Sequence, residues 1–279
     1  MENILFLVEG TKIDMTAIDF ACYIAKLTHS KLNVIFLEKL EGGKVPELKQ
    51  LYGIPYVETI TAFDLPENRE KRKQSQENEK LFAEACLNRG VNYQIQHNLS
   101  LFPNEVTDES RFADLLIINA ELLYEKKNEG FPSQFVKEIL SRSECPVLIA
   151  PFSFHEIEEV LFAYDGSKSS VYSIKQFIHL FPELLKKKVT VLHIEGSEGN
   201  LLNQERSCTD LLSAHFQEVA YEHLKGKASD ELFGYLLEKK HLFVVMGAYG
   251  RGMLSSIFRK STADLLLKTI NLPIFIAHN

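Results

Sequence analysis

The chain has 279 residues, more than one compact domain usually needs, because single hydrophobic cores stop growing at roughly 100 to 200 residues. Its residues are 45% hydrophobic and 25% charged, as in an ordinary globular protein, and its formal net charge is −7. An acidic chain lacks the basic surface that sequence-independent nucleic-acid binding requires. We therefore predict two domains and no nucleic-acid partner.

The sequence also contains no recognisable targeting segment and no paired-cysteine motif. No stretch approaches the roughly 20 apolar residues of a membrane-spanning helix, and Glu2 stands where a secretory signal has basic residues. We expect a cytoplasmic protein without membrane contact. The cysteines are scattered, without the C-x-x-C pair of a redox or metal motif, and we interpret them as buried small apolar side chains. They are Cys22, Cys86, Cys145 and Cys208.

The first half alternates short apolar runs with helix-like stretches, which is typical of parallel βαβ units. The predicted strands are 4–8, 32–37, 93–97, 115–119 and 147–150, and the predicted helices are 15–28, 69–88 and 134–141. Five strands with their crossovers make a complete doubly wound domain, which we assign to residues 1–151. Residues 41–70 interrupt the pattern, and a loop this long is usually functional or disordered. A lid, an interface loop and a mobile excursion all remain open.

The second half repeats this order of elements. The predicted strands are 160–164, 189–194, 218–222, 243–246 and 274–277, and the predicted helices are 170–180, 200–215, 229–239 and 262–269. Residues 143–151 match 270–278, and residues 112–119 match 240–247. A period of about 127 residues marks a duplicated domain, since solenoid units are far shorter. We assign the second domain to 156–279 and expect the short aromatic linker, 151–158, to pack.

A glycine-containing stretch follows the fourth predicted strand of the second half. Gly247 and Gly250 would let a backbone approach a phosphate closely, and a helix start at Ser261 and Thr262 would offer free N–H groups to an anion. Ligands of open parallel sheets bind beyond the carboxyl ends of the strands, where the strand order reverses. The alternative is that Ser261 and Asp264 form a capping box and that the glycines are ordinary turn residues.

An acidic turn, Asp165-Gly166-Ser167, follows the first predicted strand of the same half. The carboxylate would accept hydrogen bonds from a ribose or a base, and Gly166 would open the turn. In the alternative interpretation the turn is only a helix entry, with Asp165, Ser167 or Ser169 as the N-cap.

The two stretches together resemble the universal stress protein family. The resemblance lies in the Asp-Gly-Ser turn, the Val-Val-Met-Gly strand end, the Gly-x2-Gly-x9-x-Ser-Thr spacing and the Leu-Pro-Ile-Phe-Ile strand. It covers both halves in layout and the second half in motif. It implies two tandem doubly wound α/β domains with five-stranded parallel sheets, of the Rossmann-like, adenine nucleotide α-hydrolase-like class. Family members pair through the last strand, so it also implies an internal pseudo-dimer, as a monomer or as a dimer of tandems.

The resemblance further implies a nucleotide site, because some members bind ATP through a Gly-x2-Gly-x9-Gly-Ser/Thr motif. Mg²⁺ would enter only together with ATP. The implied contacts are Asp165 to the nucleoside, the Ile194 backbone to the adenine, Gly247 and Gly250 to the ribose and phosphates, and Ser261 and Thr262 to the phosphates.

One departure affects this site, because Lys260 stands where the motif has its third glycine. In a left-handed backbone a lysine costs about 1–2 kcal/mol, and its side chain would fill the phosphate space. In the opposite interpretation Arg251, Arg259 and Lys260 form a cationic cluster that strengthens the anion site. In the first half Glu9-Gly10-Thr11 replaces the turn, and residues 119–127 contain neither motif glycine, so we predict no nucleotide there.

Conventional catalytic and metal-binding sets are not found in the sequence. The histidines lack zinc spacing, and neither a Gly-x-Ser-x-Gly elbow nor a Walker lysine is present. We interpret His193 as a packed strand residue rather than a base. The leading hypothesis is a non-catalytic stress-response regulator, at most a weak ATPase, with unidentified protein partners. One alternative is an interaction scaffold that binds no nucleotide. The other is an ATP-using enzyme of the α-hydrolase-like group, which would need a phosphate loop after the first strand and an acceptor-substrate site, and the Asp165-Gly166-Ser167 turn is too short to be that loop.

Overall fold

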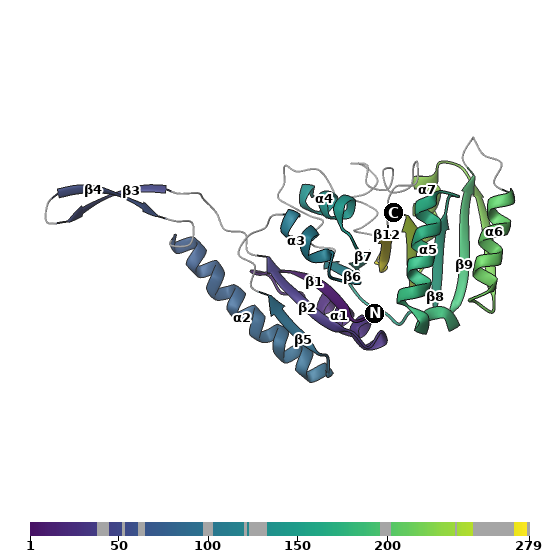
Figure 1. Cartoon of the computed structure of the whole chain (residues 1–279), viewed down its shortest axis with the longest axis horizontal. Helices are drawn as coiled ribbons and strands as arrows, with labels where there is room; N and C mark the ends of the chain where they lie inside the picture. The colour runs from purple at the N-terminus through teal and green to yellow at the C-terminus, as the bar shows by residue number, and fades with distance from the viewer. Residues whose placement is uncertain are drawn as a thin grey trace.

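A mostly parallel sheet with helices on both faces forms the body of the protein (Figure 1). The computed structural model describes residues 1–37, 45–51, 54–60, 65–96, 103–119, 122, 133–195, 202–237, 239–247 and 271–277. Among the helices of these residues, none is both long and apolar enough to cross a bilayer. The predicted helix 262–269 lies outside the described residues.

The first half contains every strand and helix predicted for it, with bounds that agree within three residues. Its elements in the main fold are β1 (Asn3–Glu9), α1 (Met15–Leu27), β2 (Lys31–Leu37), α2 (Pro66–Arg89), β5 (Tyr93–Gln96), α3 (Pro103–Ser110), β6 (Leu115–Asn119), α4 (Gln134–Arg142) and β7 (Val147–Ala150). Strands β1, β6 and β7 are buried along most of their length. Burial on both faces explains why they read as continuous apolar runs.

The second half repeats this order. Its elements are β8 (Glu159–Tyr164), α5 (Lys168–Leu180), the short 3₁₀ helix η3 (Pro182–Lys186), β9 (Lys188–Glu195), α6 (Leu202–Ser213), β10 (Val219–Lys225), α7 (Ala228–Leu237), β11 (Leu242–Gly247) and β12 (Ile274–Ala277). The sequence did not predict η3. All the other described elements match predictions within three residues.

The two halves join into one sheet with the strand order β10-β9-β8-β11-β12-β7-β6-β1-β2-β5. Neighbouring strands are parallel except at the centre, where β12 and β7 pair antiparallel. There Phe275 pairs with Leu148, the residue that holds the same position in the first half, so a pseudo-twofold axis passes through this pair. The expected internal contact through the last strands is therefore confirmed, and it merges two five-stranded sheets into one of ten strands.

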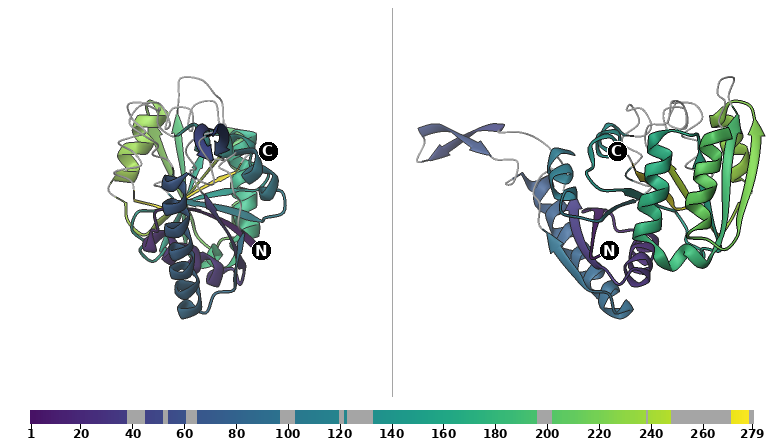
Figure 2. Two further views of the ribbon diagram at one scale, coloured as in Figure 1. Left: turned by 90° about the vertical axis from the view of Figure 1, so that its left-hand side faces the viewer. Right: turned by 45° about the vertical axis from the view of Figure 1, so that its right-hand side comes forward.

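Two apolar clusters fill the two faces of this sheet. One cluster packs under α1, α2, α5 and α6, and the other under α3, α4 and α7. Alternate residues of a strand point to opposite faces, so Phe6 belongs to the first cluster and Leu7 to the second. Figure 2 shows α5 and α6 beside each other on one face.

The linker between the halves packs against both of them, as predicted. The Phe154 ring lies 4.6 Å from the Tyr23 ring between centroids, and Ile157 is 1% exposed. The Glu158 N–H donates to the His241 carbonyl over 2.8 Å. The linker therefore holds α1 and the start of β11 in one rigid unit.

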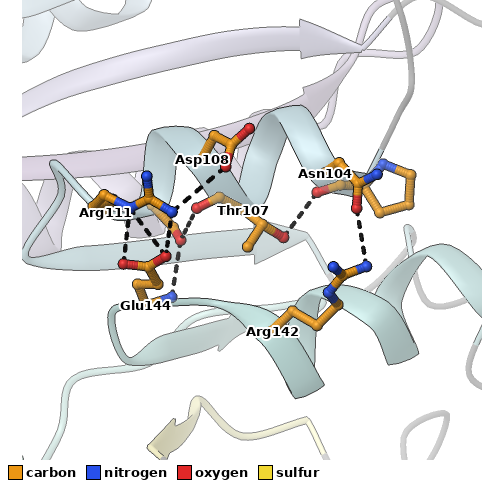
Figure 3. Close-up of polar contacts among 8 residues, drawn as sticks. Asn104, Thr107, Asp108, Arg111, Arg142 and Glu144 are labelled. Carbon is orange, nitrogen blue, oxygen red and sulfur yellow. Dashed lines mark hydrogen bonds and ion pairs between the residues drawn. The ribbon is translucent and has the colours of Figure 1, made fainter.

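Helix α3 was not predicted from the sequence, because its eight residues contain few apolar side chains. Tertiary contacts hold it against α4 (Figure 3). Arg111 pairs with Glu144 over 2.6 Å, which keeps the pKa of that carboxyl below its usual range, and Arg142 donates to Asn104 over 3.0 Å. The Glu144 N–H donates to the Ser110 hydroxyl over 3.0 Å. These contacts join residues that are distant in the chain, so the sequence around α3 does not predict the helix.

The described part of the excursion at 41–70 is not a structureless loop. Strands β3 (Val45–Leu51) and β4 (Ile54–Ile60) form an antiparallel ribbon that is separate from the main sheet. The ribbon projects away from the body (Figure 1). The sequence concealed it because each strand contains a proline, Pro46 or Pro55, and proline argues against a strand.

The central joint gives a prediction for stability. Phe275 is fully buried and its ring contacts those of Phe177 and Phe181, so Phe275→Ala should lower the free energy of unfolding by about 3–5 kcal/mol. Phe112 is 75% exposed, and Phe112→Ala should change it by less than about 0.5 kcal/mol. Denaturant titration measures both variants, and equal effects would contradict the assigned core.

Candidate functional site

The acidic turn after β8 leads directly into helix α5. The Asp165 Oδ1 atom accepts a hydrogen bond from the Ser167 N–H over 3.0 Å, and Gly166 has a left-handed φ of 73°. Ser167 is the N-cap of α5 and its hydroxyl accepts from the Ser170 N–H over 3.1 Å. The helix-entry interpretation is thus realised, with Ser167 as the cap. Asp165 keeps a second carboxylate oxygen beside the helix start.

Gly247 ends β11 and lies against the first turn of α5. A Cβ atom on Gly247 would lie 2.6 Å from the Ser169 carbonyl carbon and 2.7 Å from the Ser170 nitrogen, closer than such atoms approach. Only glycine therefore fits between this strand and helix. The Ser173 hydroxyl fastens the same contact, since its oxygen lies 2.9 Å from the Met246 carbonyl oxygen and 3.0 Å from that of Ala277.

Strand β9 carries the third predicted contact. The Ile194 side chain is 7% exposed and packs on the face covered by α7. Its neighbour His193 points to the other face and is 4% exposed, and its Nδ1 lies 3.0 Å from the Tyr164 carbonyl oxygen. Because a carbonyl only accepts, that nitrogen carries the proton. His193 is therefore a packed strand residue, as predicted.

The structure brings three predicted site residues to one edge of the sheet. Asp165, Ile194 and Gly247 stand at the carboxyl ends of β8, β9 and β11, which are adjacent in the order β9-β8-β11. The chain leaves β8 toward β9 on one side, while β11 lies on its other side, so this edge is the topological switch point. The remaining predicted residues, Gly250, Lys260, Ser261 and Thr262, lie outside the described residues.

The corresponding edge of the first half is covered by helix α2. The Gly10 carbonyl accepts from the Asn78 side-chain amide over 2.8 Å, and a Cβ on Gly10 would lie 2.8 Å from the Ser75 hydroxyl. Where the second half has Gly247, the first has Asn119, whose amide donates to the α1 cap Asp14 over 3.1 Å. Asn119 therefore contacts the side chain of Asp14, whereas Gly247 lies against the backbone of Ser169 and Ser170 and the Ser169 hydroxyl.

A cavity of about 600 Å³ lies beside the second-half turn, between α5 and α6. Sequence reasoning missed most of its walls, because residues on two helices face each other only in the folded chain. The described lining residues are Tyr164, Gly166, Ser167, Lys168, Val171, Tyr172, Ile174, Lys175, Ser207, Cys208 and Leu211.

The doubled strand order, the antiparallel central joint and the switch-point turn define a two-part α/β protein of the doubly wound class. The chain is 23% identical over 285 residues to Universal stress protein Slr1230 of Synechocystis sp., covering 98% of this chain and 99% of that protein. A scan against protein-family models finds no match.

Solved structures agree with this likeness. A universal stress protein from Archaeoglobus fulgidus DSM 4304 superposes with a TM-score of 0.66 at 15% identity, over 99% of this chain and 96% of its own. A protein from Pseudomonas aeruginosa UCBPP-PA14 that is assigned to the same family gives 0.61 at 15% identity, over 100% and 93%. The resemblance to universal stress proteins is confirmed along the whole chain, and the fold is theirs.

Because of the close contact at Gly247, adding one methyl group there should strongly lower the stability of the fold. Gly247→Ala should lower the free energy of unfolding by about 1–3 kcal/mol, because strand and helix must separate to admit it. The matched control is Gly234 in helix α7, where a Cβ would meet nothing within 4 Å, so Gly234→Ala should raise stability by about 0.5–1 kcal/mol. Thermal or denaturant unfolding compares the two, and a tolerated Gly247→Ala would contradict the packing described.

Proposed function

We propose that this chain is a tandem universal stress protein, a cytoplasmic, non-catalytic stress-response regulator that binds an adenine nucleotide in its second domain. The two domains would be residues 1–151 and 156–279. The observation that carries the proposal is the placement of Asp165 and Gly247 on either side of the α5 start, at the switch point of the second half. The whole-length likeness to universal stress proteins supports it.

The chemistry of the described residues fits the nucleoside part of such a ligand. Asp165 uses one oxygen for its own turn, which leaves the other to accept from ribose hydroxyls. The backbone at Ile194, beside β8, would meet the adenine edge. The phosphates would be bound by Gly250, Lys260, Ser261 and Thr262. Mg²⁺ would be present only together with ATP. No catalytic base is assigned, so any ATPase activity would be weak.

The first domain is proposed to bind no nucleotide. Asn78 and Ser75 of α2 occupy the space beside Gly10 that a ligand would need. Glu9 stands where the second half has Asp165 and carries a longer side chain at the same turn. The two domains would therefore differ in function, and the internal pairing of β7 with β12 makes a monomer or a dimer of tandems the expected assembly.

Calorimetric ATP titration, with mass spectrometry of ligand released from the denatured protein, tests the site. The wild type should bind with micromolar affinity, and Asp165→Ala should weaken binding by about tenfold as a charge-assisted hydrogen bond is lost. Glu9→Ala is the matched control in the first half and should change nothing.

Lys260→Gly separates the two interpretations of Lys260. Loss of affinity in this variant would show that the lysine serves the phosphates, whereas binding that appears only in this variant would show that it closes the site. Absence of ATP from both proteins would refute nucleotide binding.

An interaction scaffold without nucleotide is the second candidate function. The observation that favours it is the β3–β4 ribbon, which lies outside the main sheet and projects from the body (Figure 1). A two-stranded ribbon alone is marginally stable in water, so a partner protein would add to its stability.

A further inference from the structure

In the first half, an aromatic side chain of α2 stands at the position that corresponds to Cys208 of the cavity between α5 and α6. Phe82 of α2 is fully buried there, and its ring lies 6.4 Å from that of Phe6, 5.9 Å from that of Phe36 and 5.8 Å from that of Tyr93. These four rings thus pack together between α2 and the strands β1, β2 and β5.

Strand pairing identifies the matching residues of the second half. Phe6 pairs with Val34 in β2, and Phe162 pairs with Val191 in β9. Two residues further along these strands stand Phe36 and His193, so His193 holds the place of Phe36.

The same comparison extends to the neighbouring strand and helix. Val34 pairs with Ile95, and Val191 pairs with Tyr221, which places Val219 at the position of Tyr93. The sheet-facing residues Phe82, Ala85 and Cys86 of α2 correspond in spacing to Cys208, Leu211 and Leu212 of α6. Cys208 therefore stands where Phe82 stands.

The substitutions remove the aromatic plug from the second half. A thiol replaces the Phe82 ring, a valine replaces the Tyr93 ring, and an imidazole replaces the Phe36 ring. Helix α5 carries aromatic residues at Phe177 and Phe181 instead, and these pack on Phe162 of β8 and on the rings of β11 and β12. Phe216, which follows α6, also packs on Phe162. The groove beside Cys208 is left open, and this is the cavity of about 600 Å³.

The walls of this cavity combine an apolar floor with positive charge. The partly buried Val171, Tyr172 and Leu211 supply apolar surface, and the buried Tyr164 and Ile174 lie beneath them in the core. Lys168 and Lys175 lie seven residues apart on α5, hence on one helix face. Both lysines are exposed, and no acidic residue occurs among the described lining residues. The described walls of the cavity thus carry two positive charges on a chain with a net charge of −7.

We propose that the α5–α6 cavity binds an amphipathic organic anion, with a flat apolar body and a carboxylate or sulfonate at one end. The apolar body lies against Val171, Tyr172 and Leu211, and the anionic end meets Lys168 and Lys175. The volume falls within the range of small-molecule sites, roughly 300–1,000 Å³. The Tyr172 ring favours an aromatic body because tyrosine stacks on flat π systems.

This site is independent of the proposed nucleotide site. The cavity shares the turn at Gly166 and Ser167 with it but extends along the facing sides of the two helices, as far as Lys175 and Leu211. Its opening follows from the loss of the aromatic plug and does not involve Gly247. Failure of ATP binding would therefore leave this inference standing.

Fluorescence titration of the full chain with 1-anilinonaphthalene-8-sulfonate, a flat aromatic anion, tests the inference. The wild type should show saturable binding at one site, and 2-naphthoate should displace the probe. Cys208→Phe restores the plug of the first half and should weaken binding by at least about tenfold, because overpacked space excludes the ligand. The double variant Lys168→Glu/Lys175→Glu should weaken it by about fivefold through lost ion pairing.

Three controls make the outcome decisive. Lys137→Glu changes an exposed lysine on α4 of the first half and should leave binding unchanged, so an equal loss there would show non-specific charge attraction and overturn the proposal. Unchanged binding by the lysine pair variant, which alters only exposed side chains, would overturn it even where Cys208→Phe failed to fold. Displacement by 2-naphthalenemethanol as effective as that by 2-naphthoate would refute anion recognition.

An ATP titration of Cys208→Phe separates the two sites. Loss of the fluorescent probe with unchanged ATP affinity supports a distinct cavity. Simultaneous loss of both ligands in a folded variant, with ATP displacing the probe from the wild type, would show that the cavity is only part of the nucleotide site.

Discussion

The antiparallel pairing of β7 with β12 is the contact on which the rest of the structure depends. Leu148 and Phe275 meet at its centre, and both are fully buried. Two separate five-stranded sheets would each expose an edge at this point, and unpaired edges invite association with other chains. Pairing them internally removes both edges and fixes the position of β12. Strand β11 and the start of α5 are then held against β12 through the Ser173 hydroxyl.

The two halves share one backbone fold but pack their aromatic core residues differently. Aromatic residues of the first half gather under α2, around Phe82, whereas those of the second half gather under α5, around Phe177. Both arrangements fill an apolar core, but they fill opposite sides of the helix pair. Among the described residues, side chains of α2 lie beside the switch-point turn of the first half, and a cavity lies beside that of the second half. Two copies of one fold can therefore differ in the space beside the same turn.

Gly247 illustrates why a motif position accepts only glycine. The sequence pattern suggests close approach of a phosphate, and the structure supplies another close approach, that of the Ser169 and Ser170 backbone. The two roles are compatible, because the helix start that presses on Gly247 is also the element that presents N–H groups at the switch point. A glycine in such a motif therefore indicates that another group approaches its backbone closely. The tertiary structure identifies that group as the Ser169 and Ser170 backbone.

The sequence by itself determined the order of the strands and helices, the duplication, the internal pairing of last strands and the helix entry at Asp165. The order of elements follows from local apolar periodicity, the helix entry from neighbouring residues, and the duplication from matching segments about 127 residues apart. The internal pairing is what the resemblance to universal stress proteins implied. Only the tertiary structure decided that α3 forms, that β3 and β4 pair despite their prolines, and that Gly247 meets α5. It alone showed the cavity beside Cys208, because that space depends on side chains from two helices and a strand that are distant in the chain. Local sequence patterns specify whether a segment forms a helix or a strand. Packing between distant segments specifies which spaces side chains fill and which remain as cavities.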